Sequence, residues 1–189
     1  MIPIQTIEAE QLKDKYIFLD NDFLGIIFED EELLKSSLTF IDGYRVIDGF
    51  TRIEFLRDVW LPEIREKKEQ FLNSELFFPV SEHQELFKQT RENAIELSRL
   101  YAHNNPGRKG GVSTVDLLLA GTLMFYRKSI LVTGNKKDFP SCIFDTIGVL
   151  NFEQKDGHMR AISFVQFNSD KFEACKLAYA QVPNLNGAH

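Results

Sequence analysis

The sequence predicts an α/β fold in which a central, mostly parallel sheet lies between layers of helices and is followed by a C-terminal hairpin and helix. Two observations support this prediction. Short apolar runs alternate with longer segments of helical periodicity between residues 16 and 133, and such alternation is typical of a parallel sheet covered by helices. The chain has 189 residues, of which 43% are hydrophobic and 17 are Phe, so it can bury one substantial core.

The first predicted elements are a strand, a helical region and a second strand. The strand is Tyr16–Leu19, an apolar run that ends at Asp20. Apolar residues recur at helical spacing over residues 22–38 with acidic residues between them, which predicts one broken helix or two short ones. Residues 44–47 form another short apolar run and are expected to be the second strand.

A long helical stretch is predicted from Thr51 to about Leu72, interrupted early by Pro62. Thr51 and Glu54 have the three-residue spacing of a capping box, in which the two side chains satisfy the first backbone N–H groups of a helix. This pattern places Glu54 in the first turn. A short extended segment is expected next, at residues 77–80.

The second half of the chain begins with a predicted helix over residues 81–102. Its inward-facing side chains are expected to be Leu86, Phe87, Ile95, Leu97 and Leu100. Residues 104–111 are predicted to be a loop because they are rich in Asn, Pro and Gly. Ser113 or Thr114 is then expected to cap a helix over residues 115–126.

The last predicted elements are three strands and a helix. Residues 129–133 form an apolar, β-branched run and are expected to be a strand. Residues 143–152 and 159–167 flank an Asp-Gly turn signal at 156–157, which predicts a hairpin. A final helix is expected over residues 169–180.

In terms of domains, residues 1–15 are predicted to be an N-terminal extension, 16–149 the main domain, 150–182 a hairpin and helix packed on it, and 183–189 a tail. No apolar run approaches the roughly 20 residues that a membrane span needs. The N-terminus is acidic and mixed, unlike a signal peptide. We therefore expect a soluble, cytoplasmic protein with no membrane partner.

The net charge and the cysteine content limit the kinds of binding site that are expected in this protein. The net charge of −6 argues against a whole-surface grip on nucleic acid, which would need clustered cations. Local phosphate contacts remain open through three basic pairs, Arg108-Lys109, Arg127-Lys128 and Lys136-Lys137. Cys142 and Cys175 have no CxxC spacing, so neither a zinc site nor a disulfide framework is expected.

Four acidic residues are expected to meet at one edge of the sheet: Asp20, Glu54, Asp116 and Asp138. Asp20 ends a strand and Asp138 follows another, while the other two lie in the first turns of helices. In parallel βα units the carboxyl ends of strands and the N-termini of helices share the edge at which ligands bind. Crowded carboxylates repel one another, and a hard cation such as Mg²⁺ or Mn²⁺ relieves that repulsion.

Each acid also has a purely structural interpretation. Glu54 fits the second half of a capping box, Asp116 an anion at a helix N-terminus, and Asp138 a turn residue. Asp20 is harder to explain in this way, because an Asp that closes an apolar strand is a common functional placement, although turn chemistry alone is an alternative. The four together favour a functional site more strongly than any one of them.

The same segments resemble the PIN-domain family, which includes bacterial and archaeal toxin ribonucleases of the VapC type and eukaryotic RNA-processing nucleases. Residues 16–22, Tyr-Ile-Phe-Leu-Asp-Asn-Asp, look like the family's opening strand and first acid, with Asn where Thr or Ser is usual. Residues 51–56, Thr-Arg-Ile-Glu-Phe-Leu, are similar to the second motif. Residues 112–123 resemble the third, and residues 130–139, Ile-Leu-Val-Thr-Gly-Asn-Lys-Lys-Asp-Phe, the fourth. The resemblance spans residues 16–149.

This resemblance implies a PIN-like three-layer fold that hydrolyses phosphodiester bonds, usually of RNA, with one or two Mg²⁺ or Mn²⁺ ions. It implies that the catalytic and metal-binding residues are Asp20, Glu54, Asp116 and Asp138. The supporting polar groups would be Asp22, Thr133, which would orient the attacking water, and Asn135. Phosphates would be held by Arg108, Lys109, Lys136 and Lys137. Homodimerisation is frequent in the family, and toxin members have an antitoxin partner.

Two alternatives remain open. Asp20-Asn-Asp22 imitates the DxD loop of haloacid-dehalogenase-like phosphatases and residues 130–133 imitate their second motif, but the later paired acids of that family are represented only by Asn168-Ser-Asp170. The other alternative is a catalytically silent PIN fold used as an interaction module. Metal-dependent RNA cleavage, or turnover of p-nitrophenyl phosphate, would distinguish these functions.

Overall fold

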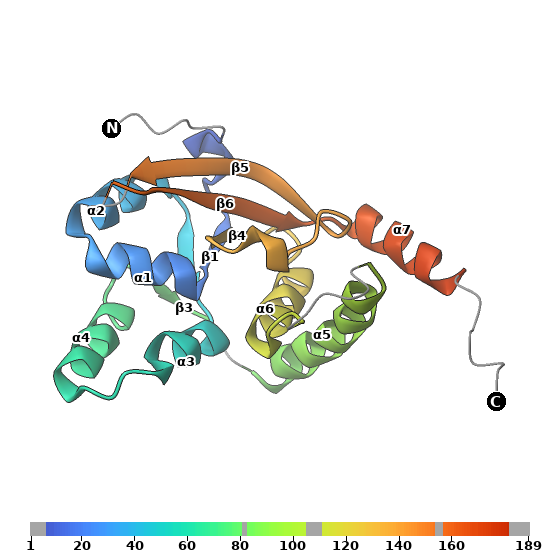
Figure 1. The fold of residues 1–189 in the computed structure, drawn as a ribbon, viewed down its shortest axis with the longest axis horizontal. Helices are drawn as coiled ribbons and strands as arrows, with labels where there is room; N and C mark the ends of the chain where they lie inside the picture. The colour runs from blue at the N-terminus through green and yellow to red at the C-terminus, as the bar shows by residue number, and fades with distance from the viewer. Residues whose placement is uncertain (1–6, 81–82, 105–110, 154–156, 182–189) are drawn as a thin grey trace.

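A computed structural model describes residues 7–80, 83–104, 111–153 and 157–181 (Figure 1). Its elements are, in chain order, the 3₁₀ helix η1 (Ala9–Gln11), β1 (Tyr16–Leu19), α1 (Asn21–Glu29), α2 (Glu31–Phe40), β2 (Tyr44–Ile47), α3 (Gly49–Arg57), α4 (Pro62–Leu72), β3 (Phe78–Pro79), α5 (Gln84–Asn104), α6 (Thr114–Phe125), β4 (Ile130–Thr133), the 3₁₀ helix η2 (Lys136–Asp138), β5 (Phe144–Glu153), β6 (Met159–Phe167) and α7 (Ser169–Ala180). Most of them lie close to the predicted ranges.

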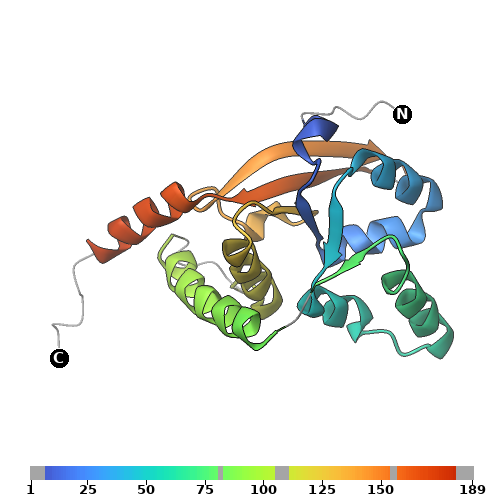
Figure 2. The same cartoon turned by 180° about the vertical axis from the view of Figure 1, so that it is seen from behind.

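The strands form one six-stranded sheet in the order β3-β2-β1-β4-β6-β5 (Figures 1 and 2). β1 pairs in parallel with β2 and β4, and β2 with β3. The predicted hairpin is confirmed, and its strand β6 joins β4 in antiparallel orientation. The α/β class is therefore confirmed, and the sheet is mixed, because the hairpin adds two antiparallel pairings to the three parallel ones.

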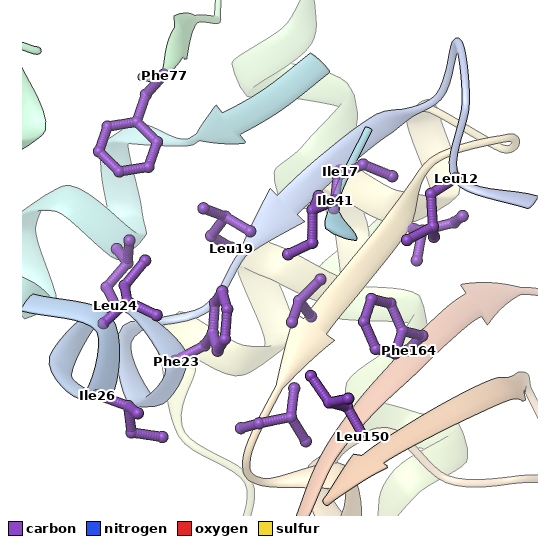
Figure 3. Packing of buried hydrophobic residues seen from close by; sticks show 14 of the residues in the cluster. Leu12, Ile17, Leu19, Phe23, Leu24, Ile26, Ile41, Phe77, Leu150 and Phe164 are labelled. Atoms are coloured by element: carbon purple, nitrogen blue, oxygen red, sulfur yellow. The ribbon is translucent and has the colours of Figure 1, made fainter. Parts of the chain in front are cut away.

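The sheet buries side chains on both faces, as the alternation along β1 shows. Ile17 and Leu19 belong to one apolar cluster, whereas Phe18 between them belongs to a second. Figure 3 shows the first cluster, with Ile17 and Leu19 on the same side of the sheet as Phe164 of β6. Residues of α1, α2, α3 and α4 cover this face, and residues of α5, α6 and α7 cover the other. The arrangement has three layers.

The region 22–38 forms two helices because Asp30 caps the second of them. The Asp30 carboxylate accepts hydrogen bonds from the N–H groups of Glu32 and Leu33, at 3.1 Å each. Asp30 itself has an extended backbone, so α1 ends there and α2 starts anew.

Helices α5 and α6 pack closely because Gly121 has no side chain. A β-carbon at Gly121 would collide with the carbonyl oxygen of Thr90 and lie 3.1 Å from the backbone nitrogen of Ala94. Asn93 of α5 also donates a hydrogen bond to the Gly121 carbonyl, at 3.0 Å. The face of α5 that carries Thr90 and Ala94 therefore packs against α6 and points inward.

This contact explains why two of the predicted inward residues of α5 are wrong. Leu86, Leu97 and Leu100 are buried as expected, but Phe87 and Ile95 are 56% and 52% exposed. The prediction followed the largest apolar side chains. The inward face is instead set by the close approach of the two backbones, which turns the helix so that both residues face outward.

The capping box predicted at Thr51 is also wrong, because α3 begins earlier. Its N-cap is Asp48, whose carboxylate accepts a hydrogen bond from the Thr51 N–H at 2.7 Å. Glu54 is therefore the sixth residue of the helix and not part of its first turn. The Thr51 hydroxyl is buried and has no hydrogen-bond partner among the described residues.

These contacts predict opposite results for two neighbouring substitutions. Asp48→Ala should lower the free energy of unfolding by about 1 kcal/mol, since it removes the cap, whereas Asp48→Asn should retain most of it. Thr51→Val should leave stability unchanged or raise it, because valine keeps the shape and removes an unpartnered hydroxyl. Urea unfolding of the three variants tests this. Greater destabilisation by Thr51→Val than by Asp48→Ala would restore the predicted capping box.

None of the helices in the described part of the chain has both the length and the hydropathy needed to cross a bilayer. At the N-terminal side, Ile7 and Leu12 are buried in the first apolar cluster. At the other end, strand β5 spans the predicted domain boundary at residue 149. Cys142 and Cys175 are free thiols.

Candidate functional site

The carboxyl ends of the parallel strands bring polar residues together at one edge of the sheet. β1 ends next to Asp20, and β4 ends with Thr133. The register of β1 with β2 pairs Tyr16 with Tyr44, so Asp48 follows β2 at the position equivalent to Asp20. Helices α1 and α3 start from these two acids, and α3 also contacts α6, which carries Asp116 in its first turn.

Asp20 is buried at this edge and is 4% exposed. It caps α1, accepting a hydrogen bond from the Asn21 N–H at 2.7 Å. Its other oxygen accepts one from the Thr133 hydroxyl at 2.6 Å. Burial, together with the charges of Asp116 and Asp22, raises the pKa of Asp20 to about 7 against the opposing effect of the Thr133 hydrogen bond. Near neutral pH this carboxyl group is therefore poised between its two protonation states.

Asp116 connects the acids electrostatically. Burial raises its pKa, the hydrogen bond from the Ser113 hydroxyl at 2.6 Å lowers it, and the charges of Asp138 and Asp22 raise it. The charge of Asp116 in turn raises the pKa values of both Asp20 and Glu54. The charge of Asp116 thus interacts unfavourably with those of Asp20, Asp22, Glu54 and Asp138 across this edge.

Glu54 reaches the same edge from the second turn of α3. Its pKa is raised mainly by burial and then by the charge of Asp116, while Arg57 lowers it. The charges of Asp22 and Asp48 also raise it. Glu54 is half-buried, so it remains accessible from solvent.

Asp138 lies in η2, just beyond β4, and is 4% exposed. The Asn135 side-chain amide donates a hydrogen bond to its carboxylate. The Asn135 backbone N–H donates to the Thr133 hydroxyl at 2.9 Å, and that hydroxyl donates to Asp20. Thr133 therefore links the first acid to the loop that carries the fourth.

The predicted supporting residues take distinct places. Asp22 lies in the first turn of α1, and a β-carbon on Gly134 would be 3.4 Å from its side chain, so it faces the end of β4. The Thr133 hydroxyl donates a hydrogen bond to Asp20, whereas the resemblance implied that Thr133 orients the attacking water. Of the predicted cations, Lys136 and Lys137 are part of η2 beside Asp138. Arg108 and Lys109 lie outside the described residues.

One acid of this edge was missing from the predicted site. Asp48 is 5% exposed and raises the pKa of Glu54. The sequence contained a signal for it, since an apolar run followed by Asp was the pattern that identified Asp20. The Thr51 and Glu54 spacing instead shifted the expected helix start past Asp48.

The donors at this edge are carboxylate and hydroxyl oxygens, which suit hard cations such as Mg²⁺ and Mn²⁺. Throughout the described ranges, however, no three His, Cys, Asp or Glu side chains are positioned to share one metal ion. A cation that bound here would draw in carboxylates that now stand apart. The pKa values of Asp20 and Asp116 are raised first by burial and further by neighbouring acids, and a bound cation would offset both effects.

A scan against protein-family models matches no family, and searches of the curated proteins and of the solved structures find no match. The resemblance to PIN domains thus stands on the quoted segments of the sequence.

Proposed function

We propose that the protein is a metal-dependent nuclease with a PIN-like fold that hydrolyses phosphodiester bonds of RNA. The observation that carries this proposal is the set of mutually repelling carboxylates at this edge of the sheet, which includes the buried Asp20. Bringing carboxylates together costs free energy, and groups with strongly shifted pKa values are found preferentially at functional sites. RNA as the substrate comes from the resemblance.

Asp20, Glu54, Asp116 and Asp138 are the residues that would hold Mg²⁺ or Mn²⁺. When bound, such an ion supplies Lewis-acid chemistry by activating a water and stabilising negative charge on the phosphate. Thr133 positions Asp20 by its hydrogen bond, and Asn135 positions Asp138. Lys136 and Lys137, beside Asp138 in η2, would contact the phosphates on either side of the cleaved bond.

Metal binding should stabilise the fold, because a cation relieves the repulsion among the four acids. The expected gain is RT ln(1 + [L]/Kd), or about 2.7 kcal/mol at a hundredfold excess over Kd. Thermal melting with and without millimolar Mn²⁺ measures it. Asp58→Asn is the control, since Asp58 is exposed and pairs with Arg57, and it should keep the full response. Equal melting temperatures with and without metal would contradict the proposed site.

The nuclease itself is tested by cleavage of single-stranded RNA in Mn²⁺, with single-stranded DNA and p-nitrophenyl phosphate as competing substrates. RNA cleavage that stops on chelation is the expected result. Turnover of p-nitrophenyl phosphate alone would favour the phosphatase alternative, and no turnover of any substrate would favour the interaction module. Homodimerisation, control by an antitoxin and a cytoplasmic location belong to the same proposal, and light scattering tests the first of them.

A further inference from the structure

A cavity of about 450 Å³ opens beside the acidic edge, between the N-terminal turns of α3 and α5. Its principal lining residues are Asp48, Phe50, Ile53, His83, Phe87 and Thr90. Asp48 belongs to both regions, because it lines the cavity and its charge raises the pKa of Glu54. The cavity is therefore adjacent to the proposed catalytic acids, and its size is that of a small-ligand pocket.

The sides of this pocket are apolar and partly aromatic. The rings of Phe50 and Phe87 lie 6.1 Å apart between centroids, with an angle of 32° between their planes. Phe87 is 56% exposed and Ile53 is 65% exposed, although both are large apolar residues. A flat ring that entered the pocket would cover these surfaces and stack on an aromatic side chain.

The lining of the pocket also includes polar side chains. The Thr90 hydroxyl is buried, with the residue 1% exposed, and it has no hydrogen-bond partner among the described residues. His83 accepts a hydrogen bond from the Leu86 N–H on Nδ1 at 3.1 Å, so its neutral form carries a proton on Nε2 that is available to a ligand. Together with the Asp48 carboxylate, these groups offer both hydrogen-bond donors and acceptors.

We propose that this pocket binds one nucleobase of a single-stranded RNA substrate, next to the bond that is cleaved; this inference rests on the proposed nuclease function. A base is flat, stacks on Phe and carries donors and acceptors at its edge, as these walls require. A phosphate would be repelled by the Asp48 charge. An apolar protein side chain would leave the Thr90 hydroxyl without a partner.

The test measures the affinity of fluorescent RNA octamers in Ca²⁺ without Mn²⁺, using the intact octamer and octamers with one abasic site at each position. For the wild-type protein, one abasic position should weaken binding by roughly 5- to 150-fold, the range for a stacked base. Phe87→Ala should weaken binding of the intact octamer by a similar factor. The variant should bind the intact octamer and the octamer with that abasic site with equal affinity. Ile95→Ala is the matched control, because Ile95 is an equally exposed apolar residue of α5 outside the pocket.

Thr90→Val provides a second test that does not threaten the fold, since valine fills the same space without the unpartnered hydroxyl. It should melt at or above the wild-type temperature and weaken binding of the intact octamer by about threefold or more. Equal RNA affinity of the wild type, Phe87→Ala and Thr90→Val would overturn the pocket even if RNA is cleaved. Pocket-dependent binding without cleavage would overturn only the nuclease, and absence of both would overturn both. If Phe87→Ala changed the oligomeric state and not RNA affinity, the pocket would hold a second copy of the chain instead.

Discussion

Asp20→Asn should reduce RNA cleavage by about 10²- to 10³-fold or more, the scale expected when one preorganised electrostatic group is lost from an active site. Asparagine has nearly the same size and keeps one oxygen. The Thr133 hydroxyl already accepts a hydrogen bond from the Asn135 N–H and has a second lone pair for the new amide. The fold should therefore persist, so that a loss of activity reports on charge.

The measurement is cleavage of a labelled RNA under single-turnover conditions, together with circular dichroism of each variant. Asp58→Asn makes the same chemical change at an exposed position and should cleave at the wild-type rate. Wild-type cleavage by Asp20→Asn would remove Asp20 from the proposed catalytic residues. Loss of cleavage with loss of folded signal would instead assign Asp20 a role in stability.

The metal-free protein should become more stable as the pH falls from about 7 to about 4, by up to about 4 kcal/mol. The cause is the pKa of Asp20, which lies near 7 in the folded protein and at the ordinary value of 3.8 in the unfolded chain. Below pH 4 the carboxyl group is protonated in both states and has no effect on stability. Between pH 4 and 7 the unfolded chain loses the proton while the folded protein keeps it, so folding becomes less favourable.

Asp116 and Glu54 act in the same direction because burial raises their pKa values as well. Asp145 acts in the opposite direction: its hydrogen bond with Lys171 lowers its pKa, and the stability that it contributes is lost only at lower pH. Urea unfolding at pH 4.5 and pH 7.5 measures the net effect. Asp20→Asn should remove most of the pH dependence, and a wild-type stability that rises from pH 4.5 to 7.5 would contradict the role of Asp20 in it.

Strand positions could be predicted from the sequence because each parallel strand is a short apolar run closed by a polar residue. Tyr16–Leu19 and Tyr44–Ile47 are strands as expected, and the Asp-Gly signal correctly predicted the hairpin. Local patterns were sufficient there because strand length and turn chemistry are properties of neighbouring residues. What they could not predict was the mixed sheet, since the edge joined by the hairpin depends on the whole fold.

The errors arose where a competing contact, either local or between distant elements, overrides the pattern. The Thr51 and Glu54 spacing matches a capping box, but Asp48 starts the helix three residues earlier and satisfies the same N–H group. Phe87 fits an apolar helix face, but the Gly121 contact turns it outward. The pocket that Phe87 helps to form depends on that outward turn, so no pattern along the chain predicted it.

The same limit applies to the acids. Topology brings residues up to 118 positions apart, Asp20 and Asp138, to one edge, and strand order alone allows that expectation. Whether their oxygens share a common point depends on side-chain torsions and on neighbours such as Ser113 and Asn135, which hold individual carboxylates in place. Sequence spacing contains no information about those contacts.

The two edge strands of the sheet are built in ways that disfavour strand pairing with other protein molecules. An edge strand offers unpaired backbone groups on which a strand of another molecule can add, which is a route to aggregation. At one edge, β3 has two residues, and Pro79 lacks the N–H group that an added strand would need. At the other, β5 has ten residues, but its register shifts between Thr146 and Gly148, and such a bulge distorts the row of backbone groups. Shortness protects the first edge and irregularity the second, so the sheet ends at six strands.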